Sequence, residues 1–244
     1  MLLKAAPQAA IFDLDGLLLD TERVYTEAAQ RVVGRYGKRF GWEVKRRCMA
    51  RDPMLGAGIV VQELGLPLRP EHYLEARERE LRPLLRDVAA MAGAERLVED
   101  LAGAGLPLAV ATSSLRRMFD LKTRGKAWFE HFDAIVCGDD GIGRYKPAPD
   151  IFLHAARALG IEPSACVAFE DSTAGVEAAL AAGMQVIAVP AAQYALDEFE
   201  QECQASASHV VRSLSDIDLS DLGLSSRKGT NWKQRGPRSK DSAR

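Results

Sequence analysis

Two aspartates, separated by one residue, follow an apolar segment near the start of the chain. Residues 9–12 have the length and composition of a buried parallel strand, and Asp13, Asp15 and Gly16 come directly after it. A continuing strand would carry both carboxylates on one face, and Gly16 indicates that the strand ends there in a sharp turn. The carboxyl ends of strands are where open α/β sheets bind ligands. The alternative, a turn that only caps the next helix, would be preferred if the chain offered no partners.

The chain offers such partners at three later positions, each at the end of a predicted strand or just before a predicted helix. They are hydroxyls, a lysine and an acidic pair. Hydroxyls and a lysine can bind and neutralise an anion next to a nucleophilic carboxylate, and an acidic pair can bind a cation. They are Thr112 and Ser113 after the apolar residues 106–111, Lys146 before the predicted helix 150–159, and Glu170 and Asp171 after the apolar residues 165–169.

The order DxDG, T-S-S, K-P-x-P-D and E-D-S-x-x-G resembles the four motifs of the haloacid dehalogenase (HAD) superfamily of phosphohydrolases, over roughly residues 9–224. The segments IFDLDGLLLDTE, ATSS, FDLKT, GDD, KPAPDIF and GVEAALAAGMQVIAVP are also similar to the eukaryotic pseudouridine-5'-phosphatases and the plant-type glycerol-phosphate phosphatases. The resemblance implies an α/β fold, a Rossmann-like parallel sheet core with an inserted α-helical cap domain. It divides the chain into a core (1–16 and 86–224), a helical cap (17–85) and a basic tail (225–244).

The helical pattern agrees with this division. A first helix is expected from Leu17 to about Val33, and residues 41–83 contain only helix-like periodic stretches. Alternating charges along residues 75–82, Arg77 among them, are typical of a solvated helix face. From residue 88 onward strands alternate with helices, which predicts a parallel sheet covered on both faces.

Hydrolysis of a phosphate ester needs a nucleophile, a proton donor for the leaving oxygen and neutralisation of the phosphoryl charge. Asp13 can attack phosphorus to give an aspartyl-phosphate, and Asp15 can exchange the proton; the matching positions of the resembled family have these roles. Lys146 would balance the charge of Asp13 and the phosphoryl group, although a lysine before a proline turn can also be a surface residue. Thr112 and Ser113 would bind phosphoryl oxygens, and Thr112 could instead cap the helix beginning near Leu115.

Clustered carboxylates would repel a phosphate monoester unless a cation were present, and hard oxygen ligands suit Mg²⁺. The expected ligands are Asp13, Asp171 and the backbone carbonyl of Asp15, with Glu170 acting through a water. Ser172 is expected to be a helix cap rather than a catalyst. The four cysteines and four histidines show no zinc-ligand spacing, so reduced thiols and no zinc are expected.

Composition places further limits. The chain is 47% hydrophobic and 27% charged, as is ordinary for a soluble globular protein. The tail carries seven Lys/Arg and one acidic residue, a net +6, so the remaining residues carry −8 of the total −2. We therefore expect no nucleic-acid footprint on the body and a disordered tail, with binding of the tail to anionic surfaces or nucleic acid as the alternative. We expect a monomer in the cytoplasm or an organelle matrix. We expect no membrane association, because the apolar residues 178–196 are interrupted by Gly183 and Pro190.

The cap loop departs from the resembled family. Relatives commonly have Met-Gly-Lys-Lys or Met-Gly-Arg there, whereas this chain has Met49-Ala50-Arg51-Asp52, so only Arg51 keeps a cation to contact substrate. The segment between Asp140 and Lys146 is also shorter than in the relatives that the chain resembles. The expected function is a Mg²⁺-dependent phosphomonoesterase acting on a small phosphorylated metabolite, with pseudouridine 5'-phosphate as the leading candidate. Glycerol phosphate or a sugar phosphate is the nearest alternative, a β-phosphoglucomutase-like phosphomutase is a second class, and a non-catalytic binding protein is a third.

Overall fold

The computed structural model describes residues 2–48, 52–190 and 209–225, and within them a parallel six-stranded sheet has the order β3-β2-β1-β4-β5-β6. The chain adds strands outward from β1 through β2 to β3 on one side of the sheet. It then returns to place β4 against β1 and adds β5 and β6 on the other side. This reversal beside β1 is the switch point at which doubly wound sheets bind ligands. The strands are β1 (Ala9–Phe12), β2 (Leu108–Ala111), β3 (Ala134–Val136), β4 (Cys166–Glu170), β5 (Gln185–Ala188) and β6 (His209–Val210).

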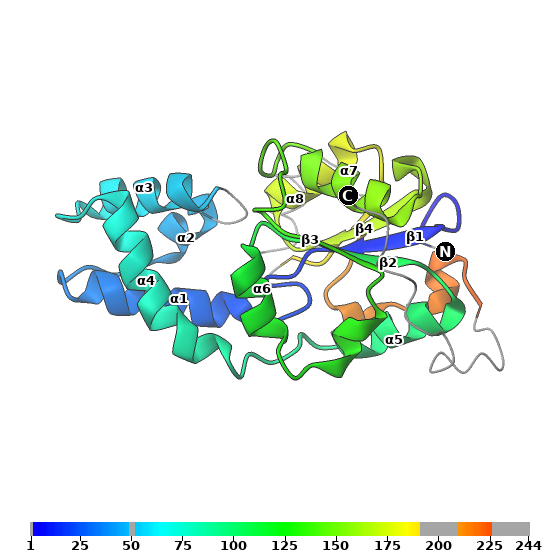
Figure 1. Cartoon of the computed structure of the whole chain (residues 1–244), viewed down its shortest axis with the longest axis horizontal. Coiled ribbons are helices and arrows are strands. Elements are labelled where there is room, and N and C mark those ends of the chain that lie inside the picture. The colour runs from blue at the N-terminus through cyan, green and yellow to red at the C-terminus, as the bar shows by residue number, and fades with distance from the viewer. Residues whose placement is uncertain (1, 49–51, 191–208, 226–244) are drawn as a thin grey trace.

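Helices cover both faces of this sheet (Figure 1), as the alternating pattern predicted. Along β1 the side chains alternate: Ala10 and Phe12 enter one buried cluster and Ala9 and Ile11 enter the other. Phe12 stacks on Phe169 of β4, with ring centroids 4.5 Å apart, and these two residues are also paired in the register of β1 with β4. The stack therefore stabilises the pairing of the central strands. One face is covered by α5 (Ala94–Ala104), α6 (Arg116–Thr123) and η1 (Ala127–His131), and the other by α7 (Asp150–Leu159) and α8 (Thr173–Ala181).

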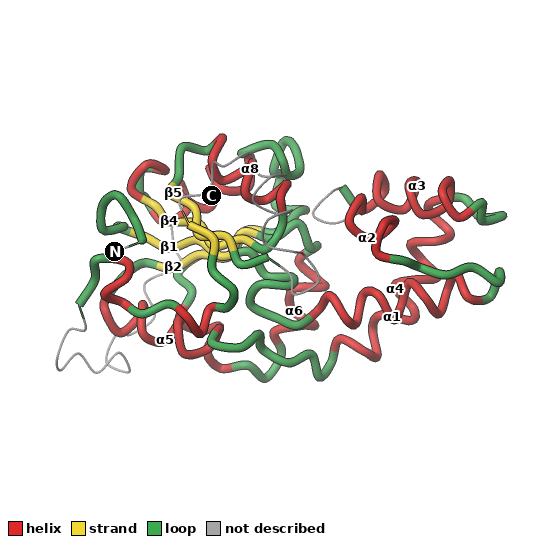
Figure 2. The backbone as a smooth tube through the Cα atoms, turned by 180° about the vertical axis from the view of Figure 1, so that it is seen from behind, coloured by secondary structure: helices red, strands yellow, loops and turns green. Residues whose placement is uncertain are grey.

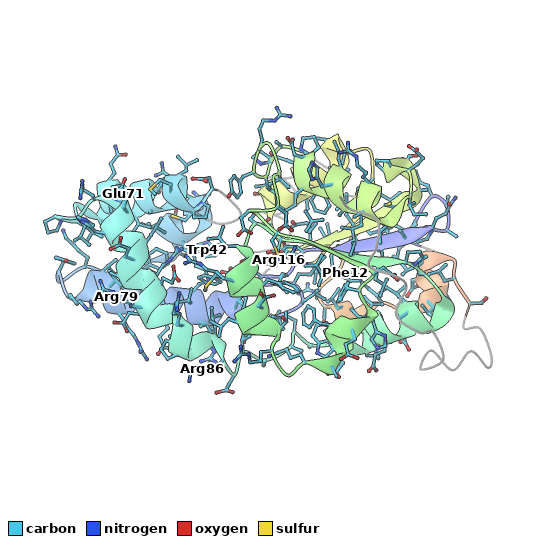
Figure 3. All side chains as sticks on the ribbon, viewed as in Figure 1. Phe12, Trp42, Glu71, Arg79, Arg86 and Arg116 are labelled. Carbon is cyan, nitrogen blue, oxygen red and sulfur yellow. The ribbon has the colours of Figure 1, made fainter. Side chains whose placement is uncertain are left out.

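Four helices form a separate lobe beside the sheet, in which Figure 2 shows helices and loops but none of the strands. The lobe has its own buried cluster, which includes Val32, Val60 and Tyr73. Exposed charges line the outer side of α4, where Figure 3 labels Glu71 and Arg79. The helices are α1 (Thr21–Gly34), α2 (Trp42–Cys48), α3 (Pro53–Leu64) and α4 (Pro70–Leu85).

The first helix of the lobe begins at Thr21, so the prediction that it begins at Leu17 is wrong. Leu17, Leu18 and Leu19 are buried with the sheet-side cluster instead. The Gly16 N–H donates to the Leu19 carbonyl at 2.9 Å, which closes a turn and delays the helix. These leucines therefore pack with the sheet rather than with the helical lobe.

The two chain segments that join the lobe to the sheet lie side by side. The Asp20 N–H donates to Ala89 O, and the Met91 N–H donates to Leu18 O, each at 2.9 Å. An antiparallel bridge pairs Leu19 with Ala90 between them. The entry to and exit from the lobe are thus tied together by backbone hydrogen bonds.

Short 3₁₀ turns complete the described structure: η2 (Pro163–Ala165), η3 (Leu214–Asp216) and η4 (Leu219–Leu222). No helix within the described ranges is long and apolar enough to cross a membrane. The basic tail, apart from Ser225, lies outside the described residues, and so does Cys203. Among the described residues, Cys48, Cys137 and Cys166 take part in no disulfide.

Candidate active site

Asp13 lies at the carboxyl end of the central strand, in contact with a buried lysine. Its backbone N–H donates to the Phe169 carbonyl at 3.0 Å, which continues the pairing of β1 with β4. Lys146, from the turn before α7, donates from Nζ to Asp13 Oδ1 at 2.5 Å and also to Glu170 Oε1. Lys146 is only 3% exposed, so the alternative that it is a surface lysine is wrong.

Glu170, the last residue of β4, is fully buried and uses both carboxylate oxygens within the chain. Oε1 accepts from Lys146, and Oε2 accepts from the Asp171 N–H at 3.0 Å and from the N–H and Oγ of Ser172 at 3.1 Å each. Gly175 makes room for this, because a Cβ there would lie 1.9 Å from the carboxylate. Ser172 Oγ accepts from the Gly175 N–H and caps α8, as predicted. Glu170 thus orients Lys146 and the turn that carries Asp171, while its water-mediated metal contact stays a prediction.

Asp171 presents a buried oxygen that the described part of the chain leaves without a hydrogen bond, Oδ2. The turn after β1 approaches this oxygen closely: Gly16 has φ +89°, and a Cβ there would lie 2.3 Å from Asp171 Oδ2. Burial raises the pKa of the Asp171 carboxyl, and the charges of Glu170 and Asp13 raise it further. A buried carboxylate without a partner is costly, and a cation would remove that cost.

The donor set suits Mg²⁺, which prefers hard oxygen ligands and keeps several waters. Asp13 and Asp171 would supply carboxylates and Asp15 its backbone carbonyl. No three Asp, Glu, His or Cys side chains cluster as a metal site anywhere in the described ranges. A set of two carboxylates completed by a carbonyl, water and substrate oxygens needs no such cluster, so the residues present fit the ion.

Asp15 has a separate set of partners, and the two that bind it most closely, Lys122 and Ser114, were not among the predicted site residues. Lys122 Nζ donates to Asp15 Oδ1 at 2.6 Å and to Oδ2 at 2.8 Å, and Ser114 Oγ donates to Oδ2 at 2.7 Å. Lys122 comes from α6 and its side chain is 0% exposed. The sequence contained a signal for it, since FDLKT was among the segments similar to the phosphatases, but a lysine within a helix predicts no contact by itself.

The two catalytic candidates have opposite electrostatic environments. Burial raises the pKa of Asp13 to about 7, the charge of Lys146 opposes this shift, and two neighbouring carboxylates add to it. Burial acts on Asp15 in the same direction, but the charge and hydrogen bonds of Lys122 outweigh it and lower the pKa of Asp15. Lys122 and Lys146 both keep their charge: burial opposes the ammonium form, and the adjacent carboxylates raise each lysine pKa above its usual value.

Thr112 follows β2 and is 1% exposed. Its Oγ1 accepts from the Ser114 N–H at 3.1 Å and lies 3.5 Å from Asp15 Oδ2. The N-cap of α6 is Leu115, without a side-chain cap, so the alternative that Thr112 caps this helix is wrong. Thr112 therefore lies beside Asp15 and lines the same cavity as Asp13, and its contact with a phosphoryl oxygen stays a prediction.

A cavity of about 290 Å³ opens onto these groups and is bounded by both the sheet side and the helical lobe. Ser113 Oγ lies at its floor, buried and without a hydrogen-bond partner among the described residues, which leaves a hydroxyl free for an anion. The cavity is lined on the sheet side by Asp13, Asp15, Thr112, Ser113, Met118 and Asp171, and on the lobe side by Tyr25, Phe40, Leu74, Arg77 and Leu81, among others.

Arg77 is an exception to the solvated face predicted along residues 75–82, on which Glu75, Arg79 and Arg82 are exposed. Tyr73, Arg77 and Leu81 recur every four residues on α4 and therefore share one face, which points inward. Arg77 is half-buried, lines the cavity and lies over the Tyr25 ring, 5.8 Å from its centroid. Its Nε is buried without a hydrogen-bond partner in the described part of the chain.

The cap loop is only partly described. Arg51 lies outside the described residues, together with Met49 and Ala50. Asp52 is the N-cap of α3, and its side chain accepts from the Leu55 N–H at 2.9 Å. The acidic residue that departs from the resembled pattern thus has a structural task at the start of a helix.

Two carboxylates at the end of a central parallel strand, a buried lysine beside them and a helical lobe that bounds the same cavity define an α/β protein with its candidate site at the carboxyl edge of the sheet. Residues 7–183 match the family model described as haloacid dehalogenase-like hydrolase. The chain therefore belongs to the haloacid dehalogenase-like hydrolases, and it is a hydrolase acting on phosphoric monoesters.

Relatives support this placement. The chain is 40% identical over 219 residues to a probable pseudouridine-5'-phosphatase of Drosophila melanogaster, which covers 88% of this chain and 93% of the relative. It is also 40% identical over 223 residues to the mitochondrial (DL)-glycerol-3-phosphatase 1 of Arabidopsis thaliana, covering 88% and 73%. Among solved structures, CbbY from Rhodobacter sphaeroides in complex with phosphate matches with a TM-score of 0.74 and 28% identity, over 89% of this chain and 100% of that one.

Proposed function

We propose that the protein is a Mg²⁺-dependent phosphomonoesterase that hydrolyses a small phosphorylated metabolite through an aspartyl-phosphate on Asp13. Pseudouridine 5'-phosphate is the leading substrate. The observation that carries the proposal is the pair of carboxylates at the cavity floor, Asp13 and Asp15, each bound to its own buried lysine. Environments that differ this much between two adjacent carboxylates are how one site separates a nucleophile from a proton carrier.

In the first step Asp13 attacks phosphorus and the bond to the leaving oxygen breaks. Lys146 balances the negative charge that Asp13 and the phosphoryl group bring together, and Glu170 holds the ammonium in place. Thr112 and Ser113 lie where they can donate to phosphoryl oxygens. When bound, Mg²⁺ supplies further neutralisation of the phosphoryl charge, with Asp13, Asp171 and the Asp15 carbonyl as its protein ligands.

Asp15 moves the proton in both halves of the reaction. The arriving phosphoryl group is anionic, and a like charge raises the proton affinity of the nearby carboxyl, so Asp15 can carry a proton to the leaving oxygen. In the second half Asp15 takes a proton from the water that attacks the phosphorylated Asp13. Free phosphate leaves and both carboxyl groups return to their starting state.

The cavity supports a leaving group larger than a polyol. Its lobe side combines the apolar Tyr25, Phe40 and Leu74 with the half-buried guanidinium of Arg77. Apolar walls with a few placed polar groups suit a planar ring whose edge carries hydrogen-bond acceptors, as in a nucleoside. Glycerol phosphate is kept as the second candidate, because the two relatives named above share the same 40% identity and differ in substrate.

Phosphate release by the purified protein with Mg²⁺ tests the proposal, over a panel of pseudouridine 5'-phosphate, uridine 5'-phosphate, glycerol 3-phosphate and several sugar phosphates. The expected result is the highest kcat/KM for pseudouridine 5'-phosphate. A higher value for glycerol 3-phosphate would overturn the substrate but keep the reaction. Isomerisation of a sugar phosphate without net phosphate release would replace the hydrolase proposal with a phosphomutase.

A further inference from the structure

Lys122 is buried at a place where a lysine has little to gain structurally. Its side chain is 0% exposed, and Nζ also donates to Ser114 Oγ, at 2.6 Å. The Tyr25 ring from α1 closes over it, with the centroid 5.0 Å from Nζ. Moving an ammonium group out of water costs about as much as a single ion pair returns, so an apolar side chain of similar volume would stabilise such a position at least as well.

The position of Nζ explains what the lysine does instead. It bridges both oxygens of Asp15, while Ser114 holds Oδ2 a second time. Lys122 and Ser114 together donate three hydrogen bonds to this carboxylate, two of them to the same oxygen, and these bonds favour a single orientation. Lys122 also supplies the positive charge on this side of the site, because Lys146 is committed to Asp13 and Glu170.

We propose that Lys122 is a positioning residue for the hydrolytic reaction: it fixes the orientation of the Asp15 carboxylate toward the leaving oxygen. The inference rests on the proposed role of Asp15. Lys122 does not touch the substrate, and it acts through Asp15, with Ser114 completing the clamp and Tyr25 covering it.

Steady-state kinetics of Lys122→Met, Lys122→Arg, Asp15→Asn and the Lys122→Met/Asp15→Asn double variant test this assignment. For an alkyl or sugar phosphate, Lys122→Met should lower kcat roughly 100-fold, with KM changing much less, because orientation and not binding is lost. With p-nitrophenyl phosphate, whose leaving group departs without a proton, the loss in kcat/KM, which reports formation of the aspartyl-phosphate, should be several-fold smaller than with the alkyl or sugar phosphate. Lys122→Arg should recover part of kcat, since a guanidinium can also bridge two carboxylate oxygens.

The double variant provides the decisive comparison. If Lys122 acts through Asp15, removing both should be no worse than removing Asp15 alone, because two residues that act as a unit are not additive. Wild-type kcat in Lys122→Met, or additive losses in the double variant, would overturn the proposal.

The same set of variants separates failure of the Lys122 proposal from failure of the proposed role of Asp15 and from loss of folding. Full activity in Asp15→Asn would instead overturn the proposed function of Asp15, whatever Lys122 does. Circular dichroism and thermal unfolding check that each variant folds. Should Lys122→Met fail to fold, Lys122→Gln replaces it in the cycle with the same expected pattern, and wild-type kcat in that variant would count equally against the proposal.

Discussion

Asp13 and Asp15 lie two positions apart in the chain, but the charges around them differ. The Asp13 side lies between β1, β4 and the turn before α7, where Lys146 is shared with Glu170, and a second carboxylate, Asp171, adds to the negative charge. The Asp15 side lies between β1 and α6, where Lys122 serves one carboxylate alone. Asp13 therefore has excess negative charge around it and Asp15 does not.

The difference shows how one strand end can supply both a nucleophile and a proton carrier. Burial acts on both carboxyl groups in the same direction, so burial cannot separate them. What separates them is the ratio of lysines to carboxylates: one ammonium for the three acids Asp13, Glu170 and Asp171 on one side, and one ammonium for Asp15 alone on the other. The excess negative charge beside Asp13 also favours the binding of a cation there.

Asp13→Asn should have the largest effect on activity. The amide cannot form the phosphoryl-enzyme, so kcat should fall by roughly 10⁴-fold or more while the fold is kept. Phosphate release and trapping of acid-stable phosphoprotein measure this. Turnover at the wild-type rate would remove Asp13 as the nucleophile and end the comparison.

Asp15→Asn should come next, with kcat lower by roughly 10²- to 10⁴-fold, the range for losing a general acid and base. With p-nitrophenyl phosphate, formation of the aspartyl-phosphate should persist and its hydrolysis should slow, so phosphoprotein should accumulate. Rapid quenching with an ³²P-labelled substrate detects it. An equal loss in Asp13→Asn and Asp15→Asn for every substrate, with no phosphoprotein in either, would show that the two carboxylates are not divided as proposed.

Lys146→Met should affect stability more than the other lysine variants. It leaves the buried Asp13 and Glu170 without their shared cation, a change that costs about 3–5 kcal/mol for a buried pair. Lys122→Met leaves only Asp15, whose side chain is 20% exposed and therefore retains some hydration. Urea unfolding should rank the two variants in that order, and the reverse order would contradict the charge ratio argued above.

The metal-free protein should lose stability as the pH rises. The folded-state pKa of Asp13 is about 7 and that of Asp171 is also raised, so the folded protein holds protons that the unfolded chain, with a pKa near 3.8, has released. Stability is then present at low pH and lost as the pH rises through about 7. Thermal unfolding in EDTA between pH 5.5 and 8 should show a loss on the order of 2 kcal/mol, reduced by Mg²⁺. A flat profile in EDTA would mean that the carboxylates are compensated without a cation.

Sequence reasoning found the Asp13 side and missed most of the Asp15 side, for a physical reason. Asp13, Thr112 and Glu170 stand at the ends of apolar strands, and parallel strands bring their carboxyl ends to one edge, so local pattern alone brings them together. Lys122 stands inside α6, where its contact depends on how the helix turns over the sheet. The orientation of Arg77 was wrongly predicted for a similar reason. The alternating charges of residues 75–82 indicate a solvated face, whereas Arg77 lies four residues from the buried Tyr73 and shares its inward face.

The fold itself was accessible because its signals are local and repeated: apolar strands, helices of ordinary length and a strand-free segment between the first two strands. The start of α1 was not accessible. Three leucines after Gly16 read as a helix, and only their burial under the sheet, with the turn bonded from Gly16 to Leu19, excludes it. At these three leucines tertiary packing outweighs the local helix propensity.

The paired crossing between Leu18–Asp20 and Ala89–Met91 has a consequence for how such enzymes diversify. Because the chain leaves and re-enters the sheet side at one hydrogen-bonded place, the helical lobe is attached as a long loop would be, and lengthening a loop costs little chain entropy. A lobe of different length and lining can therefore be grafted at this junction while the reacting groups stay in register on the strands. New substrates can arise by exchange of a module, with the chemistry inherited unchanged.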